Sequence, residues 1–122
     1  MEHKGIVFEE MVAALAKPGE QILASLTPED CHTLHMAVGI VGEAGELIDA
    51  IKKAVIYRKP LDRVNVVEEL GDLEFYMEGL RKKLNITREE TLIGNIDKLG
   101  KRYADGYSDK AAQARADKPN GE

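Results

Sequence analysis

Two stretches of sequence decide the fold: residues 34–55, LHMAVGIVGEAGELIDAIKKAV, and residues 63–84, RVNVVEELGDLEFYMEGLRKKL. In each stretch apolar residues recur at alternating intervals of four and three, which is the spacing of a helix that packs lengthwise against another helix. The short connection at residues 57–61 predicts that the two helices form an antiparallel hairpin. The two seams consist of Ile40, Ala44, Leu47, Ile51 and Ala54 in the first helix, and of Val66, Leu70, Leu73, Met77, Leu80 and Leu84 in the second.

Capping residues and helix breakers indicate the other elements. Thr27, Asp62 and Thr87 each precede a helical stretch and can cap it, and Pro28 and Glu90 strengthen the first and last of these signals. We expect helices at about 6–16, 28–57, 63–84 and 88–103, with a short apolar turn at 21–26. The fold class is therefore all-α. Residues 1–107 are expected to form one domain.

Residues 108–122 are expected to form a polar C-terminal tail, because their composition shifts to Ala, Asp, Lys, Pro and Gly. Arg115 and Lys118 could fold this tail over a bound anion as a lid. A solvated tail without such a role is the alternative.

The composition excludes several classes of function. The 122 residues include 22 Asp and Glu against 17 Lys and Arg, a net charge of -5, which is the wrong sign for a protein that coats nucleic acid. No apolar run approaches the length of a membrane span, the acidic start is unlike a signal peptide, and the single cysteine, Cys31, suits a reducing compartment. We expect a cytoplasmic protein that acts on neither a membrane nor a nucleic-acid polymer.

Four carboxylates are predicted to converge on one flank of the hairpin. Glu43 and Glu46 lie one position before the seam of the first helix, and Glu69 and Asp72 have the same offset in the second. In an antiparallel pair equal offsets fall on the same flank, and Glu46 and Asp72 are level to within about one turn when counted from the connection. Such a cluster repels itself unless protons, basic side chains or cations neutralise it. Carboxylate ligands suit Mg²⁺ or Mn²⁺.

Four glycines accompany these acids: Gly39, Gly42, Gly45 and Gly71. Each costs about 1 kcal/mol relative to alanine inside a helix, which favours a close approach of another helix or a ligand to the backbone. Two other interpretations of the acids stay open. They can be solvated faces of charged helices, and a di-iron bundle is a weaker rival because neither acid pair contains the histidine that such a site uses.

The pairs Glu43-Ala44-Gly45-Glu46 and Glu69-Leu70-Gly71-Asp72, separated by 22 residues, resemble the double acid signature of the MazG-like all-α nucleoside triphosphate pyrophosphohydrolases of bacteria and phages. The resemblance extends from about residue 34 to residue 118 and leaves the first 33 residues outside. It implies hydrolysis of a nucleoside triphosphate between its α and β phosphates, giving a monophosphate and pyrophosphate. It also implies that the four acids bind Mg²⁺, and that Glu46 or Glu43 takes the proton from the attacking water.

Eight further residues are predicted to bind the substrate: Lys53, Asn95, Lys98, Arg102, Tyr103, His35, Asn65 and Tyr76. Asn95, Lys98 and Arg102 share one face of the last long helix, where the cations would meet the β and γ phosphates. A solvated basic face near a helix C-terminus is the alternative. Lys53 can equally form a salt bridge on its own helix, and His35 can simply be packed against its neighbours.

The predicted function is Mg²⁺-dependent hydrolysis of (deoxy)nucleoside triphosphates. Two alternatives remain: hydrolysis of phosphoribosyl-ATP, and a non-catalytic helical dimerisation or adaptor module. Because one hairpin has too little core, we expect two copies to complete a four-helix bundle, as a homodimer or homotetramer. The resemblance implies the same oligomeric states.

Overall fold

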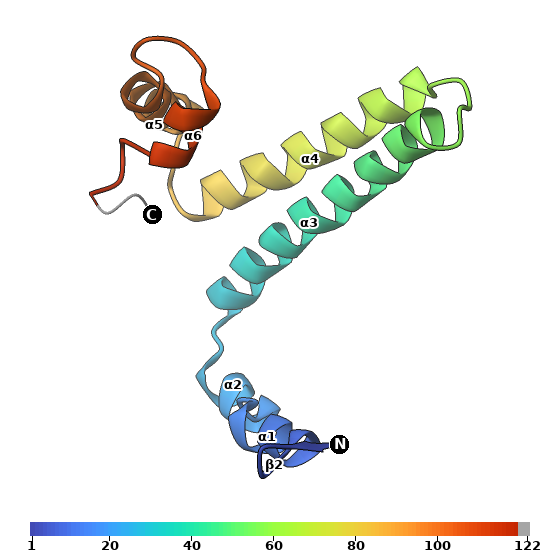
Figure 1. Ribbon diagram of the computed structural model, residues 1–122, viewed down its shortest axis with the longest axis vertical. Helices are drawn as coiled ribbons and strands as arrows, with labels where there is room; N and C mark the ends of the chain where they lie inside the picture. Colours follow the sequence, from blue (N-terminus) through green and yellow to red (C-terminus); the bar gives the residue numbers. More distant parts are fainter. Residues whose placement is uncertain (120–122) are drawn as a thin grey trace. The chain divides into compact units, whose positions relative to one another are not determined.

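The computed structural model describes residues 1–119 and is mostly helical, which confirms the predicted all-α class. In chain order the elements are β1 (Glu2–His3), β2 (Ile6–Val7), α1 (Phe8–Leu15), α2 (Gly19–Ser25), α3 (Pro28–Val55), α4 (Arg63–Lys83), α5 (Arg88–Arg102) and α6 (Asp109–Ala114) (Figure 1). The chain divides into two compact units, one ending at His32 and the other beginning at Thr33. None of the helices in residues 1–119 combines the length and apolar character needed to cross a membrane.

The first unit begins with a small antiparallel hairpin, in which Glu2 is opposite Val7 and His3 is opposite Ile6. Its turn uses Lys4 and Gly5, whose φ angles of 51° and 78° lie in the left-handed region. The predicted helix at about 6–16 is therefore shorter than expected, because β2 occupies its first two residues. The predicted apolar turn at 21–26 is instead part of the helix α2.

Helices α3, α4 and α5 begin at the predicted caps. The Thr27 hydroxyl accepts the backbone N–H of Asp30, and the Asp30 carboxylate accepts that of Thr27, both at 3.1 Å. The Asp62 carboxylate caps α4 at 3.1 Å, and the Thr87 hydroxyl caps α5 at 3.0 Å. In the predicted tail, the Ser108 hydroxyl caps α6 in the same way. Local hydrogen bonding thus fixes where each helix starts.

Helices α3 and α4 form the predicted antiparallel hairpin (Figure 1), and residues of both the predicted seams and the acid flank are covered in it. Eight of the eleven seam residues are half-buried. Ile51, Leu70 and Leu84 of the seams are 38%, 49% and 49% exposed. Buried or half-buried residues of the acid flank are Gly39, Glu43, Ala50, Asn65, Glu69 and Tyr76, and Met36, which continues the first seam, is buried as well.

Glycines on the acid flank allow close contacts between the two helices there. A Cβ atom on Gly39 would lie 2.2 Å from the Tyr76 ring, and one on Gly79 would lie 2.5 Å from the Met36 sulfur. Each glycine therefore leaves room for a large side chain of the facing helix. The helices approach closely on this flank because larger residues would keep them apart.

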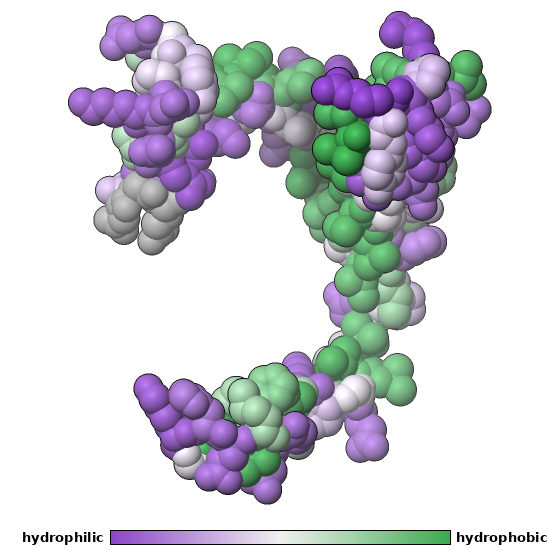
Figure 2. Space-filling model, turned by 45° about the vertical axis from the view of Figure 1, so that its right-hand side comes forward, coloured by the Kyte–Doolittle hydropathy of each residue, from purple (hydrophilic) through white to green (hydrophobic). Residues whose placement is uncertain are grey.

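The opposite side of α3 carries a second apolar stripe that no part of the described chain covers. Leu34, Val38, Val41, Ile48 and Val55 are separated by four, three, seven and seven residues, which places them on one side of the helix, and they are 57% to 73% exposed. Figure 2 shows apolar side chains at the surface of the hairpin. A helix that is apolar on two sides is typical of one buried between neighbours.

Candidate metal and nucleotide site

Three carboxyl groups meet at the middle of the hairpin. Glu43 comes from α3, and Glu69 and Asp72 come from successive turns of α4; one oxygen from each lies within 4.8 Å of the others. Glu43 and Glu69 are half-buried in the contact between the helices, whereas Asp72 is exposed. The antiparallel packing thus brings together three of the four acids that the sequence analysis singles out.

The Glu69 carboxyl group has the least favourable surroundings in this cluster. Its Oε2 atom is buried and has no hydrogen-bond partner among the described residues. The contact with the Glu43 carboxyl, desolvation, and the negative charges of Glu43, Asp72 and Glu46 together raise the pKa of Glu69 to about 7. A buried carboxylate oxygen without a donor, surrounded by other carboxylates, fits a divalent cation with oxygen ligands.

The fourth predicted ligand, Glu46, lies outside this group of three oxygens and is exposed. Next along the same stripe, Lys53 forms an ion pair with Asp49 at 3.0 Å, which raises the pKa of Lys53 and lowers that of Asp49. Lys53 therefore already has a partner on its own helix, as the alternative interpretation expects. Its side chain is 58% exposed and can still reach a ligand beside α3.

Tyr76 lies one turn beyond the acids and packs against the α3 backbone at Gly39. The His35 ring meets it edge-on, with centroids 6.2 Å apart, so the structure brings these two predicted substrate residues together. The predicted Asn65 lies in the first turn of α4, where its backbone N–H binds Asp62.

The interpretation of the four glycines as points of close approach holds at Gly39. A Cβ on Gly42, Gly45 or Gly71 would meet nothing within 4 Å in this chain. These three positions are therefore open to solvent, a ligand or another protein surface.

One of the predicted phosphate-binding residues of α5, Arg102, contacts the C-terminal segment. Arg102 forms an ion pair with Asp117 that leaves their side chains 15% and 8% exposed. Lys98 and Tyr103 are half-buried, and Asn95 is exposed. Within residues 1–119, no hydrogen bond or ion pair links these α5 residues to the three acids, so their contact with the substrate stays a prediction.

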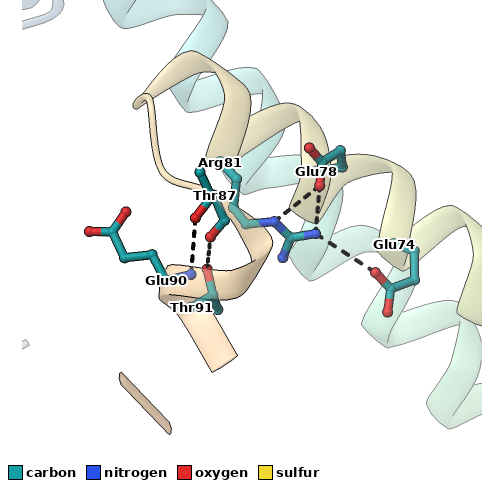
Figure 3. Close-up of polar contacts among 6 residues, drawn as sticks. All are labelled: Glu74, Glu78, Arg81, Thr87, Glu90 and Thr91. Atoms are coloured by element: carbon teal, nitrogen blue, oxygen red, sulfur yellow. Dashed lines mark hydrogen bonds and ion pairs between the residues drawn. The ribbon is translucent and has the colours of Figure 1, made fainter. Parts of the chain in front are cut away.

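Two charged residues were missed by the sequence analysis. Arg81 is 8% exposed near the end of α4, where it donates to Glu78 at 2.9 Å and lies 3.9 Å from Glu74, beside the Thr87 cap (Figure 3). Its partners precede it by three and seven residues, a helical spacing that could have indicated the pair. Asp117 follows Arg102 by 15 residues, and no periodic pattern predicts that contact.

Comparison with known families agrees with this geometry. The family model described as "MazG nucleotide pyrophosphohydrolase domain" matches residues 32–106, and thus covers α5 and the α3–α4 hairpin with its acid cluster. No curated protein and no solved structure is similar enough to match the chain. The MazG-like resemblance of the sequence is confirmed, and the chain belongs to the MazG family of nucleotide pyrophosphohydrolases, which are hydrolases.

Proposed function

We propose that this protein hydrolyses (deoxy)nucleoside triphosphates to a nucleoside monophosphate and pyrophosphate, with Mg²⁺ as cofactor and Mn²⁺ as a possible substitute. The observation that carries the proposal is the convergence of Glu43, Glu69 and Asp72 within 4.8 Å in a chain of this family. Such a cluster is costly to hold without a cation. A triphosphate carries about four negative charges, so this acidic protein needs cations to bind it.

The three clustered carboxylates would hold the metal, and Glu46 would complete the set when its side chain turns toward them. Bound Mg²⁺ would supply positive charge that acidifies water and neutralises phosphate oxygens. Glu46 or Glu43 would accept a proton from the attacking water. The water oxygen bonds to the α phosphorus, and the α–β bridging oxygen leaves with the pyrophosphate.

The other residues would bind the substrate. Lys98 and Arg102 would contact the β and γ phosphates, with Asn95 and Tyr103 on the same helix. Lys53 would contact a phosphate, and His35 would contact the base or ribose. Asn65 and Tyr76 would form hydrogen bonds with the nucleotide or with a carboxylate of the metal site. The free thiol of Cys31 is exposed, which suits an enzyme of the reducing cytoplasm.

The proposal includes a second copy of the chain, as a homodimer or homotetramer. Among the apolar residues of the described chain, only Met36 and Ala50 are buried, which is too small a core for a stable domain. The uncovered stripe of α3 includes a shallow apolar pocket lined by Ala37, Val38, Val41 and Gly42. Packing this stripe against another copy would complete the four-helix bundle.

The test is pyrophosphate release from a panel of ribo- and deoxynucleoside triphosphates, with and without Mg²⁺. Glu69→Gln should abolish the activity, whereas the adjacent Glu68→Gln should keep it, since Glu68 is exposed and outside the cluster. Hydrolysis of phosphoribosyl-ATP alone would replace the proposed substrate class. If no triphosphate yields pyrophosphate, the non-catalytic alternative holds. Release of inorganic phosphate would mean that a different bond is cleaved.

A further inference from the structure

The C-terminal segment contributes a nearly buried acid to the helix that carries the predicted phosphate-binding residues. Asp117 accepts a hydrogen bond from the Nε atom of Arg102. The side chain of Asp117 is 8% exposed and that of Arg102 is 15% exposed, and the hydrogen bond from Arg102, together with its positive charge, holds the pKa of Asp117 below its usual value. Asp117 lies beyond residue 106, where the family match ends.

The pairing with Asp117 occupies the Nε edge of the Arg102 guanidinium group and leaves the edge with the two Nη nitrogens free. Within residues 1–119, the two Nη nitrogens of Arg102 have no hydrogen-bond partner, and Glu69 Oε2 is the buried polar side-chain atom that lacks one. The Nη nitrogens are therefore not completely buried. A guanidinium fixed at Nε with its Nη pair free presents the fork that binds phosphate through two hydrogen bonds.

The net charge around Arg102 is positive, which also favours binding of an anion. Asp117 alone would cancel the charge of Arg102, but the Lys118 ammonium lies 3.8 Å from the other Asp117 oxygen. Arg102, Asp117 and Lys118 together keep one net positive charge. Lys98, half-buried one turn before Arg102 on α5, adds another.

We infer that Asp117 is a positioning residue of the phosphate site: it fixes Arg102 at Nε, so that the Nη nitrogens are oriented in advance to bind the terminal phosphates of the substrate. The inference rests on the proposed function, because Arg102 must meet the phosphates for its orientation to matter. Fixing the side chain before binding removes part of the entropy that a mobile arginine would lose.

The experiment compares Asp117→Asn with Asp109→Asn in the full chain. Asp109 lies in the same segment but accepts a hydrogen bond from the Tyr107 hydroxyl at 2.7 Å, so it is the matched control. Calorimetry measures the Kd of Mg²⁺-tripolyphosphate and of a nucleoside monophosphate, and steady-state kinetics measures kcat and KM for the best triphosphate.

For Asp117→Asn we expect the Kd of tripolyphosphate and the KM to rise about tenfold, the effect of weakening one charge-assisted contact. The kcat and the Kd of the monophosphate should stay within about twofold of the wild type, because the β and γ phosphates alone use Arg102. Asp117→Glu should restore part of the loss, and Asp109→Asn should match the wild type.

Two results would overturn the inference while wild-type pyrophosphate release upholds the proposed function. The first is unweakened tripolyphosphate binding in Asp117→Asn: binding as tight as in Asp109→Asn would mean that Asp117 does not orient Arg102, and tighter binding would mean that Asp117 competes with the anion. Alternatively, kcat, KM and monophosphate binding can all deteriorate together, which would make the ion pair purely structural. If the wild-type protein neither binds tripolyphosphate nor releases pyrophosphate, the proposed function fails, and this inference fails with it.

Discussion

Replacing Gly39 by alanine tests the contact on which the acid site depends. A Cβ at this position would lie 2.2, 2.4 and 2.5 Å from three carbons of the Tyr76 ring, whereas carbon atoms pack at about 3.5–4.0 Å. The ring or the helix must therefore move by more than ~1 Å. Overpacking of this kind costs about 1–3 kcal/mol, and alanine returns about 1 kcal/mol of helix propensity.

The expected net loss is about 0–2 kcal/mol in the free energy of unfolding, or up to about 10 °C in Tm. Gly94→Ala in α5 is the matched control, because a Cβ there meets nothing within 4 Å. That variant should gain about 0.5–1 kcal/mol from helix propensity alone. Thermal and urea unfolding, followed by circular dichroism at one protein concentration, measure both changes.

A Gly39→Ala protein as stable as Gly94→Ala would refute the packing of Tyr76 on the α3 backbone. A further check uses Tyr76→Ala, which removes the ring. In the Tyr76→Ala protein, Gly39→Ala should not lower the free energy of unfolding and should even raise it, because the clash is gone. Continued destabilisation there would show that the loss comes from another contact.

Three other predictions concern the acids and the uncovered face of α3. Glu69→Gln and Asp72→Asn should each lower pyrophosphate release at least about a hundredfold and weaken Mg²⁺ binding measured by calorimetry, since each removes a charged ligand. Because the pKa of Glu69 is raised to about 7, Mg²⁺ affinity should rise from pH 6 to pH 8. The free energy of unfolding of the metal-free protein should fall as pH rises toward 7, and both pH dependences should be weaker in Glu69→Gln. Val41→Glu, at a side chain that is 73% exposed, should lower the mass measured by analytical ultracentrifugation, with helicity retained; an unchanged mass would contradict the proposed interface.

Local signals predicted the helices well, because each depends on residues a few positions apart. Thr27, Asp62 and Thr87 cap the helices at which the sequence places them. The strands β1 and β2 gave no such signal, since two residues are too few to show alternation. Their hairpin depends on Lys4 and Gly5 in the left-handed conformation, which the sequence pattern alone did not indicate.

Contacts between elements were predicted less completely. The hairpin and its acid flank follow from periodicity, but the close contacts on this flank depend on which large side chain fits over which glycine. Gly39 accepts Tyr76, and Gly79 accepts Met36; the sequence offers no such pairing in advance. The ion pair of Arg102 with Asp117 is likewise a property of how α5 and the C-terminal segment pack.

The burial of the acid flank has a consequence for the site. Glu43 and Glu69 are half-buried where α3 faces α4, at positions where apolar side chains would stabilise the pair better. Carboxylates at such positions oppose folding unless a cation joins them, because burial and like charge both disfavour their ionised form. A departure from the apolar pattern at the closest point of two helices is typical of a functional site. Helix packing and metal binding therefore depend on the same contact, so substitutions that separate α3 from α4 should also separate the ligands.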